Sequence, residues 1–248
     1  MFPIFVASKG RSDTSQTLAV LKASNLSYLF FVEPQDYTKY CLVLGAQKVI
    51  MLNDNNQGLA FVRQFILDYA IANKLGWYWM LDDDITGFFK SVMSKNVRIP
   101  MADALERAEA YFKDSSQIAQ ASLEYQQYSW SAKKQFTING YCDVCVAIHA
   151  QRAKLLKFRK ETDLKVDRDF TLQVIARGFQ TIRTCKIAFA APKNGSNKGG
   201  LQDIYKQDGR ELACSKVMSD IWGDKICKLV TKDDGRSDVS INWKFFKP

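Results

Sequence analysis

Three consecutive aspartates, Asp82 to Asp84, stand directly behind the apolar segment "WYWML" at residues 77–81. Adjacent carboxylates repel one another, and at the end of a buried strand they are costly to desolvate unless a cation lies among them. Carboxylate oxygens are the ligands that Mg²⁺ and Mn²⁺ prefer, and such ions usually keep coordination positions open for substrate phosphates. The cluster therefore predicts a divalent metal site that serves a phosphate-bearing substrate. An exposed acidic turn is the weaker alternative, because the preceding segment is wholly apolar.

Two other polar segments also follow short apolar segments. "SKGR" at 8–11 comes after "IFVA", and Glu33 comes after "YLFFV". Backbone amides of such a turn can bind phosphate, and Lys9 or Arg11 would add positive charge. Taken alone, "SKGR" is better explained as an ordinary turn between a strand and a helix.

The elements that must position these residues follow from the alternation of apolar segments and helical patterns over the first ninety residues. Strands are expected at 4–8, 28–33, 48–52 and 77–81, and helices at 14–24, 37–45 and 57–76. Ser12 or Asp13 is expected to cap the first helix. The buried stripe of the third is expected to comprise Leu59, Val62, Phe65, Ile66, Tyr69 and Ala70.

Continuous apolar strands with helical crossovers predict a parallel sheet covered on both faces. Ligands of such open sheets bind beyond the carboxyl ends of the strands. Residues 8–11, Glu33 and the aspartates at 82–84 are therefore expected to meet at one edge of the sheet.

Beyond residue 90 the pattern is more mixed. We expect helices at 100–112 and 167–178, strands at 118–125, 141–149 and 180–191, and a loop at 192–200, followed by a helical segment and a basic tail. The expected organisation is an α/β core over residues 1–192, divided into halves at 1–90 and 91–192. Residues 193–248 would form a loop and a basic C-terminal extension that packs on the core.

One close pair of cysteines, Cys142 and Cys145, precedes the only histidine, His149. This spacing raises the alternative of a zinc site, but no second pair follows at the spacing of a zinc finger. The segment also alternates as a strand does, which favours thiols in the core. With a single histidine, a Ser-His-Asp triad could be built only around His149, and a pair of catalytic histidines is excluded.

Composition and charge bound the remaining classes of function. The 47% hydrophobic content excludes a disordered chain, and no apolar segment approaches the roughly 20 residues that span a bilayer. The first residues lack the basic start of a signal peptide, so we expect a cytoplasmic protein. Residues 1–132 contain 12 Lys and Arg and 13 Asp and Glu. Residues 133–192 contain 12 basic and 5 acidic residues, and residues 193–248 contain 11 basic and 8 acidic residues. The net charges of −1, +7 and +3 suggest a polyanionic partner for the C-terminal half, although a solvated basic face explains them equally well.

The segments "FVASKGRSDT", "VEPQDY", "LNDNNQGLAFVRQFI" and "WYWMLDDDITGFF", in this order and spacing, resemble a GT-A glycosyltransferase. The sequence is most similar to the TET/JBP-associated glycosyltransferases, which occur in phages and are related to the base J glucosyltransferase. The resemblance continues through "DRDFTLQVIARGF" and "NKGGLQDIYKQDGR" and covers most of the chain. It implies a GT-A-like, Rossmann-like, mainly parallel sheet flanked by helices.

The resemblance also implies roles for particular residues. Asp82 and Asp84 would hold Mn²⁺ or Mg²⁺ in a DxD-like motif. The donor, a nucleotide sugar such as a UDP-sugar, would be bound by a set that comprises Ser8, Lys9, Gly10, Arg11, Glu33, Arg63, Asp82 and Asp83. Arg63 stands early in its helix, where the helix dipole disfavours a cation, and this fits an arginine that faces donor phosphate. A surface arginine is the alternative.

In the family an acidic pair, typically Glu-Asp, opens a later helix and supplies the general base. Here Val166 occupies the glutamate position and Asp167 keeps the aspartate, with Asp169 as a substitute two residues on. An inverting transfer needs such a base to deprotonate the acceptor hydroxyl, and needs a counter-charge for the departing diphosphate, which the metal supplies. A helix cap is the competing role for Asp167.

The implied acceptor is DNA that carries 5-hydroxymethylcytosine or 5-hydroxymethyluracil, in the cytoplasm of a phage-infected bacterium. Such a base must usually be flipped out of a duplex. The residues expected to contact DNA are Lys193, Asn194, Lys198, Gly199, Gly200, Arg210 and Trp222. Alternatives are a transferase that acts on a glycan, lipid or small molecule, a metal-dependent nucleotidyltransferase, and a non-catalytic nucleic-acid-binding protein.

Overall fold

The computed structural model describes residues 1–192, 209–233 and 235–246. Over these residues it contains a ten-stranded sheet in the order β3-β2-β1-β4-β9-β7-β10-β5-β6, with β8 paired to β10, and a separate two-stranded hairpin. The strands of the large sheet are β1 (Ile4–Ser8), β2 (Tyr28–Val32), β3 (Val49–Met51), β4 (Trp77–Asp82), β5 (Gly87–Val92), β6 (Lys95–Ile99), β7 (Ile118–Tyr125), β8 (Phe136–Ile138), β9 (Cys145–His149) and β10 (Gln180–Ala190).

The first four strands are parallel to one another, as expected from the alternation of strands and helices. The remainder of the sheet is mixed. β9 is antiparallel to both β4 and β7, whereas β7 and β10 are parallel. The chain therefore has the expected α/β architecture, a mixed and mainly parallel sheet flanked by helices.

Successive side chains along each strand point to opposite faces of the sheet, and both faces are apolar, so helices cover both of them. Val6, Trp79 and Leu81 pack on one face, and Phe5, Tyr78 and Met80 on the other. The first face is covered by α1 (Gln16–Ala23), α2 (Pro34–Leu44) and α4 (Met101–Glu109). The second face is covered by α3 (Leu59–Ala72), α6 (Ala150–Ala153) and α7 (Val166–Ala176). The short helices α5 (Gln126–Ser129), η1 (Ala46–Lys48) and η2 (Lys160–Lys165) lie in connections.

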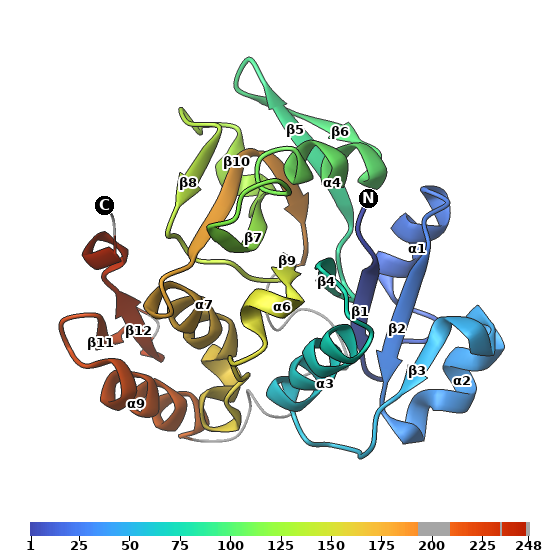
Figure 1. The fold of residues 1–248 in the computed structure, drawn as a ribbon, viewed down its shortest axis with the longest axis horizontal. Coiled ribbons are helices and arrows are strands. Elements are labelled where there is room, and N and C mark those ends of the chain that lie inside the picture. Colours follow the sequence, from blue (N-terminus) through green and yellow to red (C-terminus); the bar gives the residue numbers. More distant parts are fainter. Residues whose placement is uncertain (193–208, 234, 247–248) are drawn as a thin grey trace.

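The C-terminal elements form a layer of their own beside α7. They are α9 (Arg210–Trp222), β11 (Cys227–Thr231), β12 (Ser237–Ile241) and η3 (Trp243–Phe246). Leu172 of α7 packs with Met218, Cys227 and Val239 in a small third core. In Figure 1 this layer stands at the far side of the molecule from the N-terminal strands.

Several local expectations need correction. Ser15 caps α1, because its hydroxyl accepts the backbone N–H of Leu18, rather than Ser12 or Asp13. The buried stripe of α3 is rotated from the expected one and includes Arg63. The expected strand over 141–149 begins only at Cys145. The hairpins β5–β6 and β11–β12 were not expected, and the loop at 193–200 lies outside the described residues.

Candidate active site

The middle aspartate of the triplet is buried between the first and fourth strands. Asp83 is 5% exposed and accepts hydrogen bonds from the Ser8 hydroxyl and the Arg11 guanidinium. Burial alone would lower the pKa of Arg11, but the carboxylates of Asp83 and Asp84 raise it above its ordinary value. Arg11 of the "SKGR" turn is therefore the cation that pairs with Asp83 and Asp84.

The backbone of the triplet is held by the first turn of α1. The Ser15 hydroxyl donates to the carbonyl of Asp83 at 2.9 Å, and the Thr17 hydroxyl donates to the carbonyl of Asp82 at 2.7 Å. Thr17 Oγ1 also accepts the N–H of Ile85 at 2.9 Å. These bonds fix the backbone of the turn that carries the three carboxylates.

Asp82 and Asp84 keep partial access to solvent, with side chains 32% and 28% exposed. Two such carboxylates suit a magnesium-type ion, which is commonly held by one or two carboxylates together with water and substrate phosphates. Within the residues that the structure describes, no group of three or more His, Cys, Asp or Glu side chains is arranged to hold a metal by itself. Asp82 and Asp84 are therefore the two carboxylates at this edge that would hold such an ion.

A second group at the same sheet edge is organised around Glu33, which is buried after β2. Its carboxylate accepts from Lys9 Nζ at 3.1 Å, from the backbone N–H of Asn56 at 2.9 Å and from Gln35 Nε2 at 2.6 Å. Gly10, with φ of +65°, donates its N–H to Asp36 at 2.7 Å. The loops after β1, β2 and β3 are therefore joined, and the predicted convergence of residues 8–11, Glu33 and 82–84 is confirmed.

Arg63 lies inside the protein rather than on its surface. Its side chain is 2% exposed and pairs with Asp82 through Nη2, at 3.1 Å, and with Asp167 through Nη1. A buried arginine needs such partners, because an unpaired charge in the interior is very costly. Arg63 consequently holds the candidate metal ligand and the candidate base on either side of one guanidinium, although 85 residues separate them in the chain.

The start of α3 explains why Arg63 reaches this position. Asp163 of η2 is buried and its Oδ1 accepts the N–H of Ala60 at 3.0 Å, which caps the helix from a distant part of the chain. Gly58 precedes the helix with φ of +88°, and a Cβ there would lie 2.8 Å from Asp163 Oδ2. Only glycine allows this approach, which links α3 to the segment that leads into α7.

The two candidate bases on α7 have different environments. Asp167 is 19% exposed beside Arg63. Asp169 has no exposed side-chain surface; its Oδ1 accepts from Trp222 Nε1 at 2.9 Å and Arg159 Nη1 at 3.2 Å, and its Oδ2 from Gln173 Nε2 at 2.7 Å. Burial raises the pKa of Asp169, against the opposing effects of Trp222 and Arg159. The geometry leaves Asp167 as the accessible carboxylate.

Asp143 is a further carboxyl beside this group that the sequence patterns did not indicate. It is 6% exposed, and its Oδ2 accepts from the Tyr125 hydroxyl at 2.8 Å. Burial raises its pKa, Arg183 opposes this shift, and the negative charge of Asp82 adds to it. Val144 has φ of +56°, and its carbonyl accepts the N–H of Asp82 at 3.0 Å. A β-branched residue in this conformation is rare, so no sequence signal marked the turn.

The residues expected to contact DNA do not form one group in the described structure. Lys193, Asn194, Lys198, Gly199 and Gly200 lie outside the described residues. Arg210 is exposed at the start of α9. The indole of Trp222 is half-buried, donates to Asp169 and lies under the guanidinium of Arg159, 5.7 Å from it, so this ring is part of the packing between α9 and α7.

The close cysteine pair faces opposite sides of the sheet. Cys142 and Cys145 are both fully buried, but they belong to different core clusters. Burial raises the pKa of the Cys142 thiol to about 12. His149 uses Nδ1 to accept the N–H of Arg152 at 3.4 Å. The two thiols are core residues, and their opposite directions exclude a shared zinc ion.

Solved structures resemble this chain only distantly. A protein from STIV has a TM-score of 0.48 and 12% identity, with 78% of this chain and 87% of that chain covered. The mannose-1-phosphate geranyltransferase from Thermus thermophilus has a TM-score of 0.43 and 11% identity, covering 84% and 79%. The glycosyltransferase GlyE from Streptococcus pneumoniae, in its apo form, has a TM-score of 0.45 and 12% identity, covering 89% and 63%.

No curated protein sequence matches this one. A family model, in contrast, matches most of the chain, over residues 2–200, and its description is TET-Associated Glycosyltransferase. The matched span contains the aspartate triplet, the turn after β1, Arg63 and the first turn of α7. The chain therefore belongs to the TET-associated glycosyltransferases, and the protein is a glycosyltransferase.

Proposed function

We propose that this enzyme is a metal-dependent, inverting transferase that moves a sugar from a nucleotide sugar, such as a UDP-sugar, onto the hydroxymethyl group of a 5-hydroxymethylpyrimidine in DNA. The observation that carries the proposal is the buried Arg63, which pairs with both Asp82 and Asp167. Arg63 thereby holds Asp82, the proposed metal ligand, next to Asp167, the proposed base, at the edge of the sheet where ligands of α/β proteins bind.

The chain's own residues divide the chemistry. Asp167 takes the proton from the acceptor hydroxyl as that oxygen attacks the anomeric carbon. Lys9, Gly10 and Arg11 border the donor, and Arg63 sets the separation of Asp82 and Asp167, so that donor and acceptor are held in line. A divalent ion on Asp82 and Asp84 would offset the negative charge of the departing diphosphate.

DNA is the acceptor that the charge distribution favours. The family's description names an association with TET, and residues 133–248 carry 23 Lys and Arg against 13 Asp and Glu. Binding to DNA draws most of its affinity from cations that neutralise phosphates. Among the described residues, no helix is long and apolar enough to cross a membrane.

Mass spectrometry of nucleosides tests the proposal. DNA containing 5-hydroxymethylcytosine, 5-hydroxymethyluracil or neither is incubated with the protein, Mn²⁺ and a panel of nucleotide sugars. A sugar-mass adduct on one modified base is expected, and Asp84→Ala should abolish it while Asp103→Ala, an exposed aspartate on α4, should not. If nucleotide sugars bind but no DNA is modified, the acceptor is a glycan, lipid or small molecule. If no nucleoside diphosphate binds in Mn²⁺, the protein is not a working transferase.

A further inference from the structure

The C-terminal hairpin, which we define as β11, β12 and η3 with their connections (residues 224–246), lies beyond the residues that match the family. Its surface carries three exposed lysines, Lys225, Lys228 and Lys244. In the described part of the chain none of these three forms an ion pair, whereas Lys232 of the same hairpin pairs with Asp238 at 2.6 Å. The three ammonium groups are thus available to a partner.

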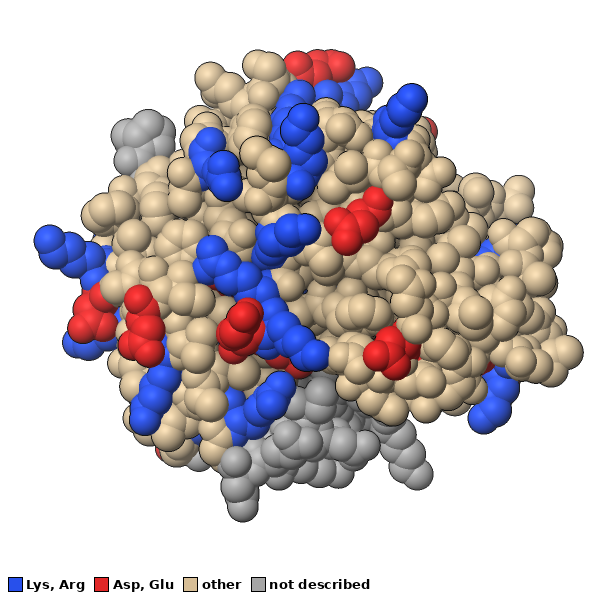
Figure 2. Space-filling view, turned by 60° about the horizontal axis from the view of Figure 1, so that its bottom comes forward, with Lys and Arg blue, Asp and Glu red and all other residues tan. Residues whose placement is uncertain are grey.

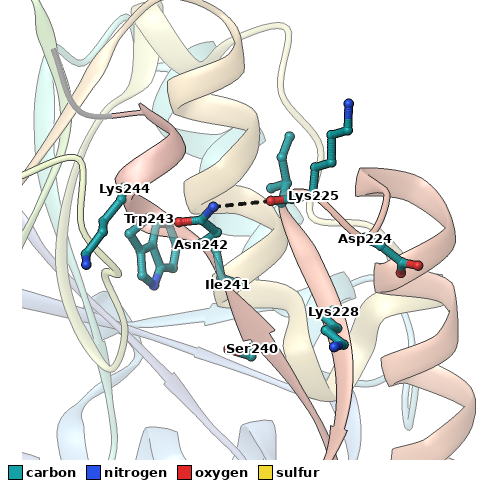
Figure 3. A pocket seen from close by; sticks show the side chains of 9 residues that line it. Asp224, Lys225, Lys228, Ser240, Ile241, Asn242, Trp243 and Lys244 are labelled. Atoms are coloured by element: carbon teal, nitrogen blue, oxygen red, sulfur yellow. Dashed lines mark hydrogen bonds between the residues drawn. The ribbon is translucent and has the colours of Figure 1, made fainter.

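These lysines border an open hollow of about 590 Å³ that Trp243 also lines. Figure 3 shows Lys244 and Trp243 on one side of the hollow and Lys225 and Lys228 on the other, with the ammonium groups pointing apart. Lysines that converge would enclose a single phosphate, but these point apart from positions around one end of the hairpin. Lys225 precedes β11, Lys228 lies near its start, and Lys244 lies in η3 after β12. Such spacing suits an extended polyanion, in which successive phosphates are contacted one by one.

The hairpin is fixed to the helix that carries the candidate base. Asp238 of β12 is 4% exposed and pairs with Lys165, the N-cap residue of α7, at 2.9 Å and with Arg168, in the first turn of that helix, at 2.7 Å. Its three cationic partners hold the pKa of Asp238 below the ordinary value, although burial alone would raise it. Because Asp167 lies between Lys165 and Arg168 in the chain, a ligand on the hairpin is held at a set position relative to it.

Aromatic packing continues this connection toward the site. The indole of Trp243 stacks on Tyr141, with ring centroids 6.2 Å apart and planes inclined by 25°. The guanidinium of Arg168 lies over the ring of Tyr141, 5.6 Å from its centroid, and Tyr141 is two residues from the buried Asp143. Asn139 Nδ2 also donates to the carbonyl of Phe246 at 2.7 Å. The stacked rings of Trp243 and Tyr141 therefore connect the hollow to Arg168 in the first turn of α7.

We propose that the C-terminal hairpin binds the sugar-phosphate backbone of the acceptor DNA through Lys225, Lys228 and Lys244, and so sets the register in which a modified base reaches Asp167. This inference rests on the proposed function. Phosphate contacts position a protein on DNA and carry no sequence information, which suits an enzyme whose selectivity comes from the modified base itself. A base that must be flipped out needs the flanking backbone held in place.

The test compares two matched triple variants. One is Lys225→Gln, Lys228→Gln and Lys244→Gln in the hairpin; the other is Lys22→Gln, Lys39→Gln and Lys74→Gln, three exposed lysines of the N-terminal half. Fluorescence anisotropy measures the affinity for unmodified duplex DNA between about 50 and 200 mM salt. The slope of log K against log salt is expected to become shallower by about 0.9 for each lysine that contacts a phosphate. Affinity should fall by about tenfold or more in the hairpin variant and stay unchanged in the control.

Activity on two acceptors completes the experiment. The hairpin variant should lose activity on duplex DNA but keep wild-type activity on the free 5-hydroxymethyl nucleoside, which has no backbone to bind. Equal slopes and equal DNA activity in the two triple variants would overturn the inference while leaving the proposed function intact. Failure of the proposed function shows separately, because the wild-type protein would then modify no DNA at all.

Discussion

Asp82, Asp83 and Asp84 are chemically identical neighbours with different environments. Asp83 is buried, paired with the guanidinium of Arg11 and hydrogen-bonded by the Ser8 hydroxyl, whereas the carboxylates on either side of it keep partial access to solvent. Three adjacent charges are tolerated because the central one is paired and hydrogen-bonded, which offsets the cost of its burial. The buried pair then holds the two outer carboxylates at the rim, where an ion and a diphosphate can reach them.

Asp167 and Asp169 show the same effect on one helical turn. Two residues apart on a helix, they cannot face the same direction, and only Asp167 keeps exposed surface. Asp169 instead joins α7 to α9 through the indole N–H of Trp222.

Exchanging each aspartate for asparagine should separate the two roles. Asp167→Asn is expected to lower kcat by about 10²–10⁴-fold, the usual contribution of a general base, with little change in the KM for the donor. Asp169→Asn is expected to lower the free energy of unfolding by about 1–3 kcal/mol, since it weakens charge-assisted hydrogen bonds, and to leave kcat per folded molecule close to the wild type. Steady-state kinetics and urea unfolding measure both. A loss of kcat in Asp169→Asn without loss of stability would make Asp169 the base.

The site is assembled by the ends of elements. The first turn of α1 holds the backbone of the aspartate triplet, and Asp163 caps α3, the helix that carries the inward-pointing Arg63. The C-terminal hairpin binds the first turn of α7 through the ion pair between Asp238 and Arg168. Backbone groups at helix ends lack partners within the helix. These ends are therefore where distant segments can be joined with precision.

The anchor at Asp238 should give stability a dependence on pH. Because its folded-state pKa is depressed, its contribution is present above the unfolded pKa of about 3.9 and is lost as the pH falls below that value. Asp238→Asn should lower the free energy of unfolding by about 2 kcal/mol at neutral pH and by much less near pH 2. Urea unfolding of the wild type and the variant at both pH values measures this. Asp233→Asn, at an exposed position of the same hairpin, is the control, and a difference that stays constant with pH would contradict the role of the anchor.

At the scale of the whole molecule, charge is unevenly distributed between the two halves. Figure 2 shows Lys and Arg gathered over the left and middle of one face, while the right part, which corresponds to the N-terminal half in Figure 1, carries few charges. The nearly neutral half contains the loops proposed to bind the donor, and the basic half contains α7 and the C-terminal hairpin. This division agrees with a compact donor on one side and a polyanionic acceptor on the other.

Ionic strength should therefore affect the two acceptors differently. For duplex DNA carrying a modified base, kcat/KM of the wild-type enzyme should fall steeply between about 50 and 200 mM salt, because binding releases counterions from the DNA and this release becomes less favourable as the salt concentration rises. For the free modified nucleoside, kcat/KM should change by less than about twofold over the same range. Initial rates measured at a saturating donor concentration give kcat/KM for each acceptor at each salt concentration. An equally flat dependence for both acceptors would point to a small-molecule acceptor.

Part of the C-terminal architecture could have been read from the sequence. The segment "CKLVTKDDGRSDVSI" contains an Asp-Gly pair between two alternating stretches, which is a recognised hairpin signal. The turn of β5–β6 is different, because Met93 and Ser94 both adopt positive φ, of 47° and 60°. That conformation normally selects Asn and Gly, so a turn made of Met and Ser cannot be recognised from the sequence.

The amino-acid sequence by itself determined the parallel half of the sheet, the edge at which residues 8–11, Glu33 and 82–84 meet, and the family. The reason is that hydrophobic periodicity is a local property, helical crossovers between neighbouring strands make those strands parallel, and the carboxyl ends of parallel strands must share an edge. Only the tertiary structure decided which aspartate is buried, that Arg63 joins Asp82 to Asp167, and that Asp143 lies beside them. These facts depend on which segments distant in the chain supply a partner for each buried charge, and the free energy of a buried charge is set by that partner.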